Sequence, residues 1–552
     1  MTEDQHKELS ENLEKSGFTN IQILNNNITC QFLLNDTDIE LSCILSECFP
    51  YELPTVYINS ESYKHFSPLP HVNHDLSICT FDRTICIPNF LFPIQVIEAS
   101  FSQAKKTICE GVLGNNQNEF FSEIGAYWQI ECTQYSDCIV IANDTIKTVK
   151  LFLGSRQAYI ADTKHHLDRY LSNVGIKKRY QKHYFDCLYL PLSIQLSPPF
   201  PTTNLELLKL FQTDPSIYHA YRVFIQKRIS KGAFILTSTP NQGTKCLQLW
   251  WQPPASISVP GFRKGHVPAN IAYLYDTQQK PVVKYAVANM RQERLFFRGG
   301  DGMCSQITRC SLIGCGSIGS YLAEALAEYG VKHFALNDKE ALSTDNITRH
   351  LCGYNYVGKR KAAAVSSALK KHNPNISTEV FDENGITFLK KHCAVMNNCD
   401  CIFIATAYTP LEYIAVEHFN SQMITKPVII LWVEPYLAAG HALIIQKPQD
   451  VFAELFDADY VFQHKVIKNH SDFSKKESGC QSTFIPYSAF HLKRFIYTFL
   501  DFLVRDVVGK HKVGNYLFTW CGDLSQIKSL GGILEDEWFT TENFSTHITR
   551  ID

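Results

Sequence analysis

A glycine-rich turn constrains this chain more than any other feature of its sequence. In "SLIGCGSIGSYLAEALAEYG", residues 311–330, Gly314, Gly316 and Gly319 stand between a short apolar run and a helical pattern. Glycines at this spacing let a backbone approach a phosphate at the start of a helix, and an acid after the next strand can bind a ribose. Asp338 follows the next apolar run, "VKHFALN". The pattern therefore predicts a nucleotide site on a Rossmann-like sheet.

The rest of the sequence indicates three domains. Helical and strand-like patterns give an α+β domain over residues 1–152, and mixed signals over residues 153–285 indicate a connecting domain. Strands and helices alternate over residues 286–552, as in a parallel sheet covered on both faces. We therefore expect an α/β protein whose nucleotide site lies in the third domain.

The composition excludes several classes of protein. The 552 residues carry a formal net charge of -2, which indicates neither a nucleic-acid-binding surface nor an acidic tail. No apolar run reaches the roughly 20 residues that span a membrane, and the start of the chain lacks the apolar core of a signal peptide. None of the 19 cysteines forms a Cys-x-x-Cys pair, so we expect reduced thiols in the cytoplasm rather than disulfides or a zinc site.

The residues after Asp338 decide which nucleotide is expected. The glycine turn and Asp338 alone would also suit NAD in an oxidoreductase. "NDKEALSTDNITRH" and "VGKRK" then add Asn346, Arg349 and Lys361 to the same region. A triphosphate carries more charge than a pyrophosphate bridge, so cations beyond the helix start favour ATP. An NAD-dependent oxidoreductase stays as an alternative.

This stretch resembles the ThiF/MoeB family of adenylyltransferases, which includes ubiquitin-activating enzymes. The positions that match are Gly314, Gly316, Gly319, Asp338, Asn346, Arg349 and Lys361, with Glu340 at a second acidic position. The resemblance implies that Asp338 binds the ribose and that Asn346, Arg349 and Lys361 hold the phosphates of ATP. It also implies a homodimer in which Arg294, within "MRQERLFFRGG", reaches the γ-phosphate of the other subunit.

Metal binding is where the sequence departs from that family. Members usually carry an Asp after the strand that reads "DCIFIATA" here, and this chain has Ala407 instead. That Asp helps to hold magnesium, so Mg²⁺ would depend on Glu340, on Asp400 or on the phosphates alone. The sequence leaves these three alternatives open.

A cysteine beyond the predicted nucleotide residues is the candidate first acyl acceptor. An adenylated carboxylate is a mixed anhydride that a thiolate can attack. Cys480, in "SKKESGCQSTF", follows Lys475 and Lys476 and precedes a long helical pattern, and positive charge and a helix start both favour a thiolate. In activating enzymes of the family the thioester cysteine lies at about this distance beyond the nucleotide residues.

The front domain resembles the ubiquitin-conjugating enzyme fold. "FPYELPTVYI" is a proline-rich turn, and "LPHVNHDLSICTFD" is similar to a His-Pro-Asn motif followed by Ile-Cys, with a valine in place of the proline. His71, Asn73 and Cys79 match that motif. The resemblance implies that Cys79 accepts the acyl group from Cys480 and that Asn73 supports the oxyanion or the loop. Cys86 is the alternative acceptor.

Together the domains resemble the bacterial fused ubiquitin-transferase-like enzymes of antiphage (CBASS) operons. The resemblance implies that the carboxyl-terminal residue of a partner cGAS/DncV-like nucleotidyltransferase is adenylated with ATP, passed through two thioesters and joined to a lysine of a target protein. We expect neither a membrane nor a nucleic acid as a direct partner. A second alternative is a ThiF-type sulfur-carrier adenylyltransferase whose front domain only binds, in which case Cys79 would be dispensable.

Overall fold

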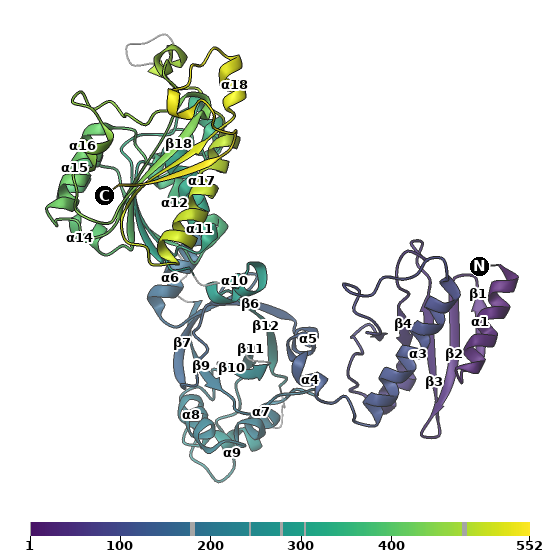
Figure 1. Cartoon of the computed structure of the whole chain (residues 1–552). Coiled ribbons are helices and arrows are strands. Elements are labelled where there is room, and N and C mark those ends of the chain that lie inside the picture. The colour runs from purple at the N-terminus through teal and green to yellow at the C-terminus, as the bar shows by residue number, and fades with distance from the viewer. Residues whose placement is uncertain are drawn as a thin grey trace. The chain divides into compact units, whose positions relative to one another are not determined.

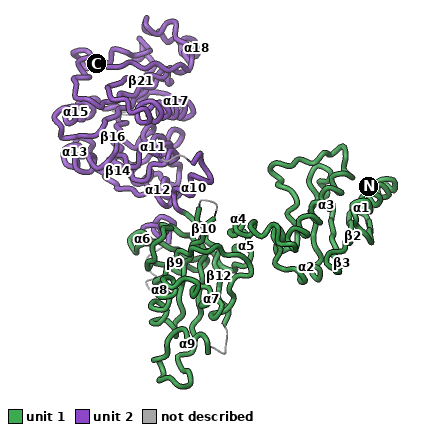
Figure 2. The backbone as a smooth tube through the Cα atoms, turned by 60° about the horizontal axis from the view of Figure 1, so that its bottom comes forward, with its two compact units in different colours: residues 1–167, 179–290 green, residues 168–178, 291–552 purple. Residues whose placement is uncertain are grey.

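The computed structural model describes residues 2–176, 183–241, 244–275, 280–302, 305–476 and 483–551 (Figure 1). The chain divides into two compact units, which Figure 2 shows in different colours: residues 1–167 with 179–290, and residues 168–178 with 291–552. Among the described residues, no helix combines the length and the apolar character that crossing a bilayer requires.

The first unit begins with an antiparallel sheet whose strands pair in chain order. Helix α1 (Glu3–Lys15) is capped by Thr2 in a capping box, and α1 packs beside the long helix α3 (Pro93–Val112). Leu9 of α1 and Phe101 of α3 are buried in the core that these helices form with the sheet. The other elements are β1 (Thr19–Leu24), β2 (Asn27–Leu34), β3 (Thr37–Ile44), β4 (Val56–Ile58), α2 (Ser60–Phe66) and β5 (Ser77–Ile78).

A second sheet in this unit closes on itself in the order β10-β11-β12-β6-β8-β7-β9, with β9 beside β10. Its strands are β6 (Gln134–Cys138), β7 (Lys147–Leu153), β8 (Ala158–Ala161), β9 (Tyr184–Pro191), β10 (Ala233–Asn241), β11 (Thr244–Gln252) and β12 (Val283–Asn289). Its helices are α7 (Asn204–Phe211), α8 (Pro215–Gln226) and α9 (Ala269–Leu274). Helix α6 (Lys164–Asn173) begins in this unit, and its residues from Asp168 on belong to the second unit.

The boundary that the sequence suggests at residue 152 falls inside β7. Strand β7 pairs with β8 and β9, and β6 pairs with β8 and β12, so both strands belong to the closed sheet. The closed sheet therefore starts before that boundary. Apolar and polar residues alternate in these short strands as they do in the front sheet. Only the strand pairing shows that they belong to the closed sheet.

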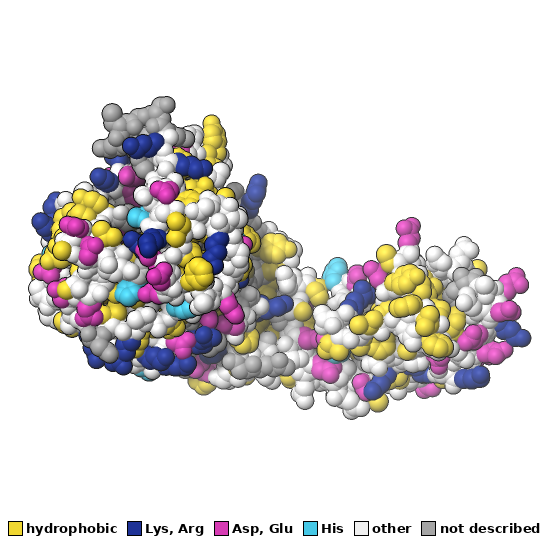
Figure 3. Space-filling model, turned by 45° about the horizontal axis from the view of Figure 1, so that its top comes forward, with side chains coloured by type: hydrophobic (Ala, Val, Ile, Leu, Met, Phe, Trp, Pro, Cys, Tyr) yellow, Lys and Arg dark blue, Asp and Glu magenta, His cyan; other side chains and the backbone are white. Residues whose placement is uncertain are grey.

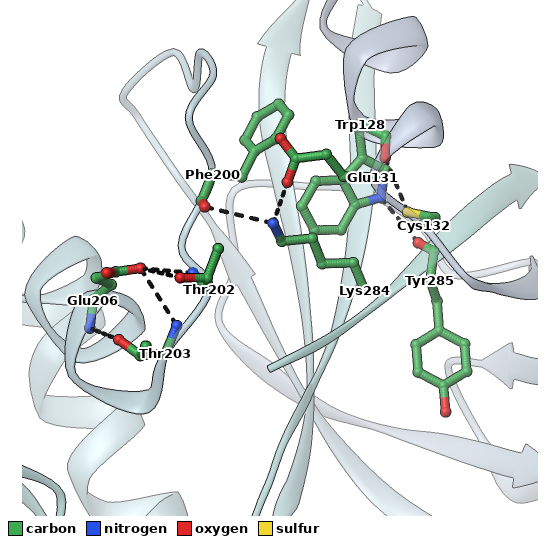
Figure 4. A network of polar contacts seen from close by, with 9 residues as sticks. All are labelled: Trp128, Glu131, Cys132, Phe200, Thr202, Thr203, Glu206, Lys284 and Tyr285. Atoms are coloured by element: carbon green, nitrogen blue, oxygen red, sulfur yellow. Dashed lines mark hydrogen bonds and ion pairs between the residues drawn. The ribbon is translucent and has the colours of Figure 1, made fainter. Parts of the chain in front are cut away.

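Two short helices connect the front sheet to the closed sheet: α4 (Glu119–Ser122) and α5 (Ile124–Ile130). Trp128 of α5 is buried, and its Nε1 donates to the carbonyl of Tyr285 in β12 at 2.9 Å. Glu131, just after α5, pairs with the ammonium group of Lys284 (Figure 4). We call α4 and α5 the connector; these contacts fix its far end to the closed sheet.

The second unit contains a sheet in the order β15-β14-β13-β16-β17-β18-β21-β22. The pairs from β15 to β17 are parallel, as the alternating sequence pattern predicts, whereas β18, β21 and β22 pair antiparallel. Its strands are β13 (Arg309–Ile313), β14 (His333–Asn337), β15 (Ser377–Phe381), β16 (Cys401–Ile404), β17 (Val428–Val433), β18 (Ala439–Ile445), β21 (Asn515–Cys521) and β22 (Thr546–Ile551).

Helices cover both faces of this sheet. One core contains residues of α11 (Ser317–Tyr329), α12 (Lys361–His372) and α17 (Ala489–Phe502). The other contains residues of α13 (Gly385–Lys391), α14 (Cys393–Asn397), α15 (Thr409–Asn420) and α16 (Val451–Leu455). The unit also includes α10 (Gln292–Gly299), α18 (Leu524–Ser529), β19 (Lys475–Lys476), β20 (Thr483–Phe484), a π-helical turn η6 (Leu503–Val508) and the 3-10 turns η2 (Thr344–Arg349), η3 (Tyr354–Tyr356), η4 (Pro435–Leu437), η5 (His470–Phe473) and η7 (Asp536–Trp538).

Candidate functional site

The glycine turn lies at the carboxyl end of β13, where α11 begins. Gly314 has a φ of 92°, and a Cβ there would lie 2.6 Å from the carbonyl oxygen of Ala405. A Cβ on Gly319 would lie 1.9 Å from the carbonyl oxygen of Gly314, so only glycine lets the helix pack against the turn. Gly316 is the N-cap of α11 and has no side chain to occupy the helix start. The first amides of α11 are therefore left for an anion.

Two buried hydroxyl groups beside this turn have no hydrogen-bond partner among the described residues. One is Oγ of Ser317, the first residue of α11, and the other is Oγ1 of Thr406, whose methyl group lies close to Gly314. Buried hydroxyls are normally hydrogen-bonded, so these two suit a polar ligand. The helix start and the two hydroxyls together fit a bound nucleotide.

Asp338 follows β14 and lies against the glycine turn. Its carboxylate accepts hydrogen bonds from the amides of Cys315 and Glu340, both at 2.8 Å. Burial raises the pKa of this carboxyl, whereas the two amides and the charge of Lys361 favour the ionised form. The structure therefore brings the predicted ribose ligand to the turn, and its contact with a ribose stays a prediction.

Lys361 begins α12 and pairs with Glu340 in the same region. Its Nζ lies 2.7 Å from Oε2 of Glu340, and its amide donates to the carbonyl of Glu340 at 2.8 Å. The hydrogen bond and charge of Lys361 lower the pKa of the Glu340 carboxyl. Only 10% of the Lys361 side chain is exposed. A lysine held in this way is a fixed cation near the glycine turn rather than a solvated surface group.

Asn346 and Arg349 lie on the 3-10 turn η2. Oδ1 of Asn346 accepts hydrogen bonds from the amide and the hydroxyl of Ser343, at 3.1 and 3.2 Å. Nη1 of Arg349 donates to the carbonyl of Ile485 at 3.0 Å, and the guanidinium lies 4.9 Å from the ring centre of Tyr487. Both side chains have partners within the protein, so their contacts with phosphate stay predictions.

Arg294 lies at the opposite end of α11 from the glycine turn. Its helix, α10, is held there by Gln292, whose Nε2 donates to the carbonyl of Gly330 at 2.9 Å. The 13 residues of α11 span about 20 Å. Nη1 of Arg294 is buried and has no hydrogen-bond partner among the described residues. Arg294 does not reach the glycine turn of its own chain.

The two carboxylates considered for Mg²⁺ lie at opposite ends of the strands. Glu340 lies at the carboxyl ends, whereas Asp400 accepts hydrogen bonds from the amides of Thr308 and Arg309 at the start of β13. Ligands of parallel sheets bind at the carboxyl ends, so Asp400 lies away from the edge where the glycine turn is, and the group that holds Mg²⁺ stays a prediction. Across the described ranges, no group of three or more His, Cys, Asp or Glu side chains is arranged to hold a metal.

The second candidate site is a tight turn that brings His71 and Cys79 together. The amide of Cys79 donates to the carbonyl of His71 at 2.8 Å, and the amide of Asn73 donates to the carbonyl of Ser77 at 2.9 Å. Nδ2 of Asn73 also donates to Oγ of Ser77 at 2.9 Å. Asn73 therefore braces the turn, which agrees with one of its two expected roles. The Cys79 side chain is exposed.

Two carboxylates from the connector flank His71. Oε2 of Glu119 lies 2.6 Å from Nε2 of His71, and Oε1 of Glu123 lies 3.5 Å from Nδ1. A hydrogen bond with the side chain of Cys79 and the two carboxylates raise the pKa of His71 to about 9, although burial acts in the opposite direction. No sequence signal pairs the connector with the turn, because the residues lie far apart along the chain.

The cavities beside the two candidate acceptor cysteines differ in chemistry. Cys79, His71 and Glu119 line a cavity of about 780 Å³. Cys86 lines a second cavity of about 410 Å³ among apolar side chains that include Phe92. Figure 3 shows apolar side chains gathered on one face of the front domain. Ile87, which also lines the second cavity, is exposed. The structure therefore gives a titratable partner to Cys79 and places Cys86 against apolar groups.

Cys480 lies outside the described residues. The described strands on either side of it, β19 and β20, pair antiparallel. Farther along, the carbonyl of Pro486 accepts a hydrogen bond from the amide of Tyr436 at 2.6 Å. The role of Cys480 as first acceptor stays a prediction.

Comparisons with known proteins assign both ends of the chain. Residues 4–136 match the model of prokaryotic E2 family B, and residues 296–415 match the model of the ThiF family. The chain joins an E2-like domain to a ThiF domain. The ThiF match favours ATP over NAD at the glycine turn.

Curated proteins match shorter parts of the chain. The chain is 32% identical over 103 residues to the ATP-dependent ubiquitin transferase-like protein Cap2 of Enterobacter hormaechei, which covers 19% of this chain and 17% of that protein. It is 24% identical over 184 residues to Cap2 of Pseudomonas aeruginosa, covering 32% of each. It is 37% identical over 76 residues to the ubiquitin-like modifier-activating enzyme ATG7 of Yarrowia lipolytica, covering 13% and 12%. The chain thus matches less than two thirds of each relative's length.

Proposed function

We propose that this chain activates the carboxyl terminus of a partner protein with ATP and conjugates it to a lysine of a target protein. The carboxylate displaces pyrophosphate from ATP, and the Cys480 thiolate then displaces AMP to form a thioester. The Cys79 thiolate takes over the acyl group and releases Cys480. A lysine amine finally displaces Cys79, losing a proton as the amide forms.

The observation that carries this proposal is the presence on one chain of two sites for successive steps. One is the glycine turn, with Asp338 and Lys361 beside it. The other is an exposed Cys79 next to His71, within the region that matches an E2 family. Joining two such sites in one chain raises the effective concentration of the thioester at the second site.

We further propose that the partner is a cGAS/DncV-like nucleotidyltransferase and that the reaction serves antiphage defence. The test is exchange of labelled pyrophosphate into ATP with a candidate nucleotidyltransferase. We expect exchange with the full-length partner and none when its last residue is deleted, because the carboxylate that reacts must fit the site. An equal rate of pyrophosphate exchange with the shortened partner, or no exchange with the intact partner, would refute the assignment of this partner.

The active species that we propose is a homodimer in which Arg294 acts on the nucleotide of the other subunit. Its support is the position of Arg294 at the far end of α11 from its own glycine turn. Arg294→Ala and Lys361→Ala should each be inactive in exchange, yet their mixture should regain activity, because the mixed dimer has one intact site. Two inactive variants that stay inactive when mixed would place Arg294 in another role.

A further inference from the structure

Three contacts of His71 come from the connector rather than from the front sheet. Nε2 and Nδ1 face the carboxylates of Glu119 and Glu123, and the amide of His71 donates to the hydroxyl of Tyr127 at 2.7 Å. Both ring nitrogens must carry protons to serve two carboxylates, so this arrangement holds the ring as an imidazolium ion.

The same connector is fixed to the closed sheet at its other end. Trp128, next to Tyr127, is buried and donates a hydrogen bond to the carbonyl of Tyr285, and Glu131 forms an ion pair with Lys284 (Figure 4). Trp128 also packs edge-on against Trp250 with ring centres 4.4 Å apart. The carboxylates that face His71 therefore stand on a segment whose position the closed sheet determines.

An imidazolium beside a thiol favours the thiolate, which is the form that attacks a thioester and the form that leaves when an amine attacks. A carboxylate near a thiol acts in the opposite direction. Other charged groups line the same cavity, and they are Asp75, Asp82, Arg83 and Glu110. The connector carboxylates thus affect Cys79 in one of two ways: as nearby negative charges that suppress the thiolate, or through His71, which promotes it.

We propose that Glu119 and Glu123 are positioning residues that hold the His71 imidazolium against Cys79, so that the connector completes the thiol site. The 2.6 Å contact between His71 and Glu119 favours action through the ring, because the Cys79 amide is bonded to the His71 carbonyl at 2.8 Å and both residues line one cavity. The part that the connector plays in catalysis rests on the proposed function. The reactivity of the Cys79 thiol can be measured without ATP or a partner, so it tests the role of Glu119 separately.

The test is the rate at which iodoacetamide alkylates Cys79 in the full chain near pH 7.5, followed by mass spectrometry of the peptide that contains Cys79. The thiolate displaces iodide, so the rate reports the thiolate fraction. We expect Glu119→Gln to slow the reaction by roughly 3- to 10-fold, the range that corresponds to the loss of one hydrogen bond. His71→Gln should slow it at least as much.

The control is Glu110→Gln, because Glu110 lines the same cavity but pairs with Lys106. That variant should react no more slowly than the unchanged chain. In the His71→Gln background, Glu119→Gln should add no further slowing, as for two residues that act through one contact. Faster alkylation in Glu119→Gln would overturn the proposal, since it would show a simple charge effect. If Glu119→Gln slowed alkylation equally in the unchanged chain and in the His71→Gln background, the proposal would also be overturned. Unfolding midpoints would show that each variant is folded.

Discussion

The guanidinium of Arg349 donates a hydrogen bond to the carbonyl of Ile485, at 3.0 Å. Arg349 belongs to the group of residues expected to hold phosphates, and Ile485 follows β20, beyond the segment that contains Cys480. Tyr487 stacks beneath the same guanidinium. A side chain that is proposed to bind ATP therefore contacts the chain that follows the proposed first acceptor.

Arg349→Ala should lower pyrophosphate exchange by about 100-fold, the usual cost of losing one charged group that stabilises a transition state. Arg349→Lys should recover part of the activity, because a lysine keeps the charge but not the planar fork. Lys332→Ala is the matched control, since Lys332 pairs with Glu293 at the amino end of β14. Unchanged exchange in Arg349→Ala would remove this residue from the ATP site.

Gly316 and Gly319 of the glycine turn differ in what a methyl group would meet. At Gly319 a Cβ would lie 1.9 Å from a backbone oxygen, whereas at Gly316 it would meet no described atom within 4 Å. Gly319→Ala should therefore lower the unfolding midpoint. Gly316→Ala should leave stability unchanged and weaken ATP binding, because the methyl group would occupy the place where the phosphate approaches. Equal ATP affinity in Gly316→Ala and the unchanged chain, measured by calorimetry, would contradict the site.

Ala407 has a φ of 48° and follows β16 at the carboxyl edge of the sheet. Asp tolerates this left-handed conformation better than most residues, so Ala407→Asp should fold normally. It should lower the Mg²⁺ concentration that gives half-maximal exchange, because it adds a carboxylate next to Thr406, which lies beside the glycine turn. Ala407→Asn, which lacks the charge, should do so less. Identical Mg²⁺ dependence in all three proteins would count against this explanation of the metal site.

The pairing of His71 with its carboxylates should make stability depend on pH. The pKa of His71 is raised to about 9 in the folded chain, from an ordinary value of about 6.5. Its stabilising contribution is therefore complete below about 6.5 and is lost as the pH rises through about 9. The unfolding midpoint of the unchanged chain should exceed that of His71→Gln most at pH 6, and the gap should close near pH 10. A gap that widens with pH would contradict the charged state.

The glycine turn and the parallel part of the ThiF sheet could be predicted from the sequence. Gly314, Gly319 and Asp338 act through local backbone geometry, and their spacing along the chain reflects it directly. Apolar strands that alternate with helices likewise predict a parallel sheet with helices on both faces.

Long-range contacts explain what the sequence did not reveal. Nothing near Glu119 or Glu123 in the sequence indicates His71, because three-dimensional packing alone joins them. The sequence also does not show strand direction, which places Asp400 at the amino ends of the strands rather than beside the glycine turn. The sequence places β6 and most of β7 within the range of the front domain, whereas both pair in the closed sheet. Short strands have the same periodicity whichever sheet they join.

The thioester relay is the central claim, and two variants separate its steps. Cys480→Ala should still exchange pyrophosphate but carry no partner, because it lacks the first acceptor. Cys79→Ala should accumulate the partner on Cys480 and form no conjugate. Because the two changes stop different steps, the adducts that they leave differ.

The most direct measurement is the mass of the enzyme–partner adducts formed with ATP in each variant, before and after treatment with a thiol. A thioester is cleaved by thiols and an amide is not. We predict a thiol-labile adduct in Cys79→Ala, no adduct in Cys480→Ala and no conjugated target in either. Normal conjugation by Cys79→Ala would show that the front domain only binds, and a thiol-resistant adduct on either variant would show another acceptor, with Cys86 the first to examine.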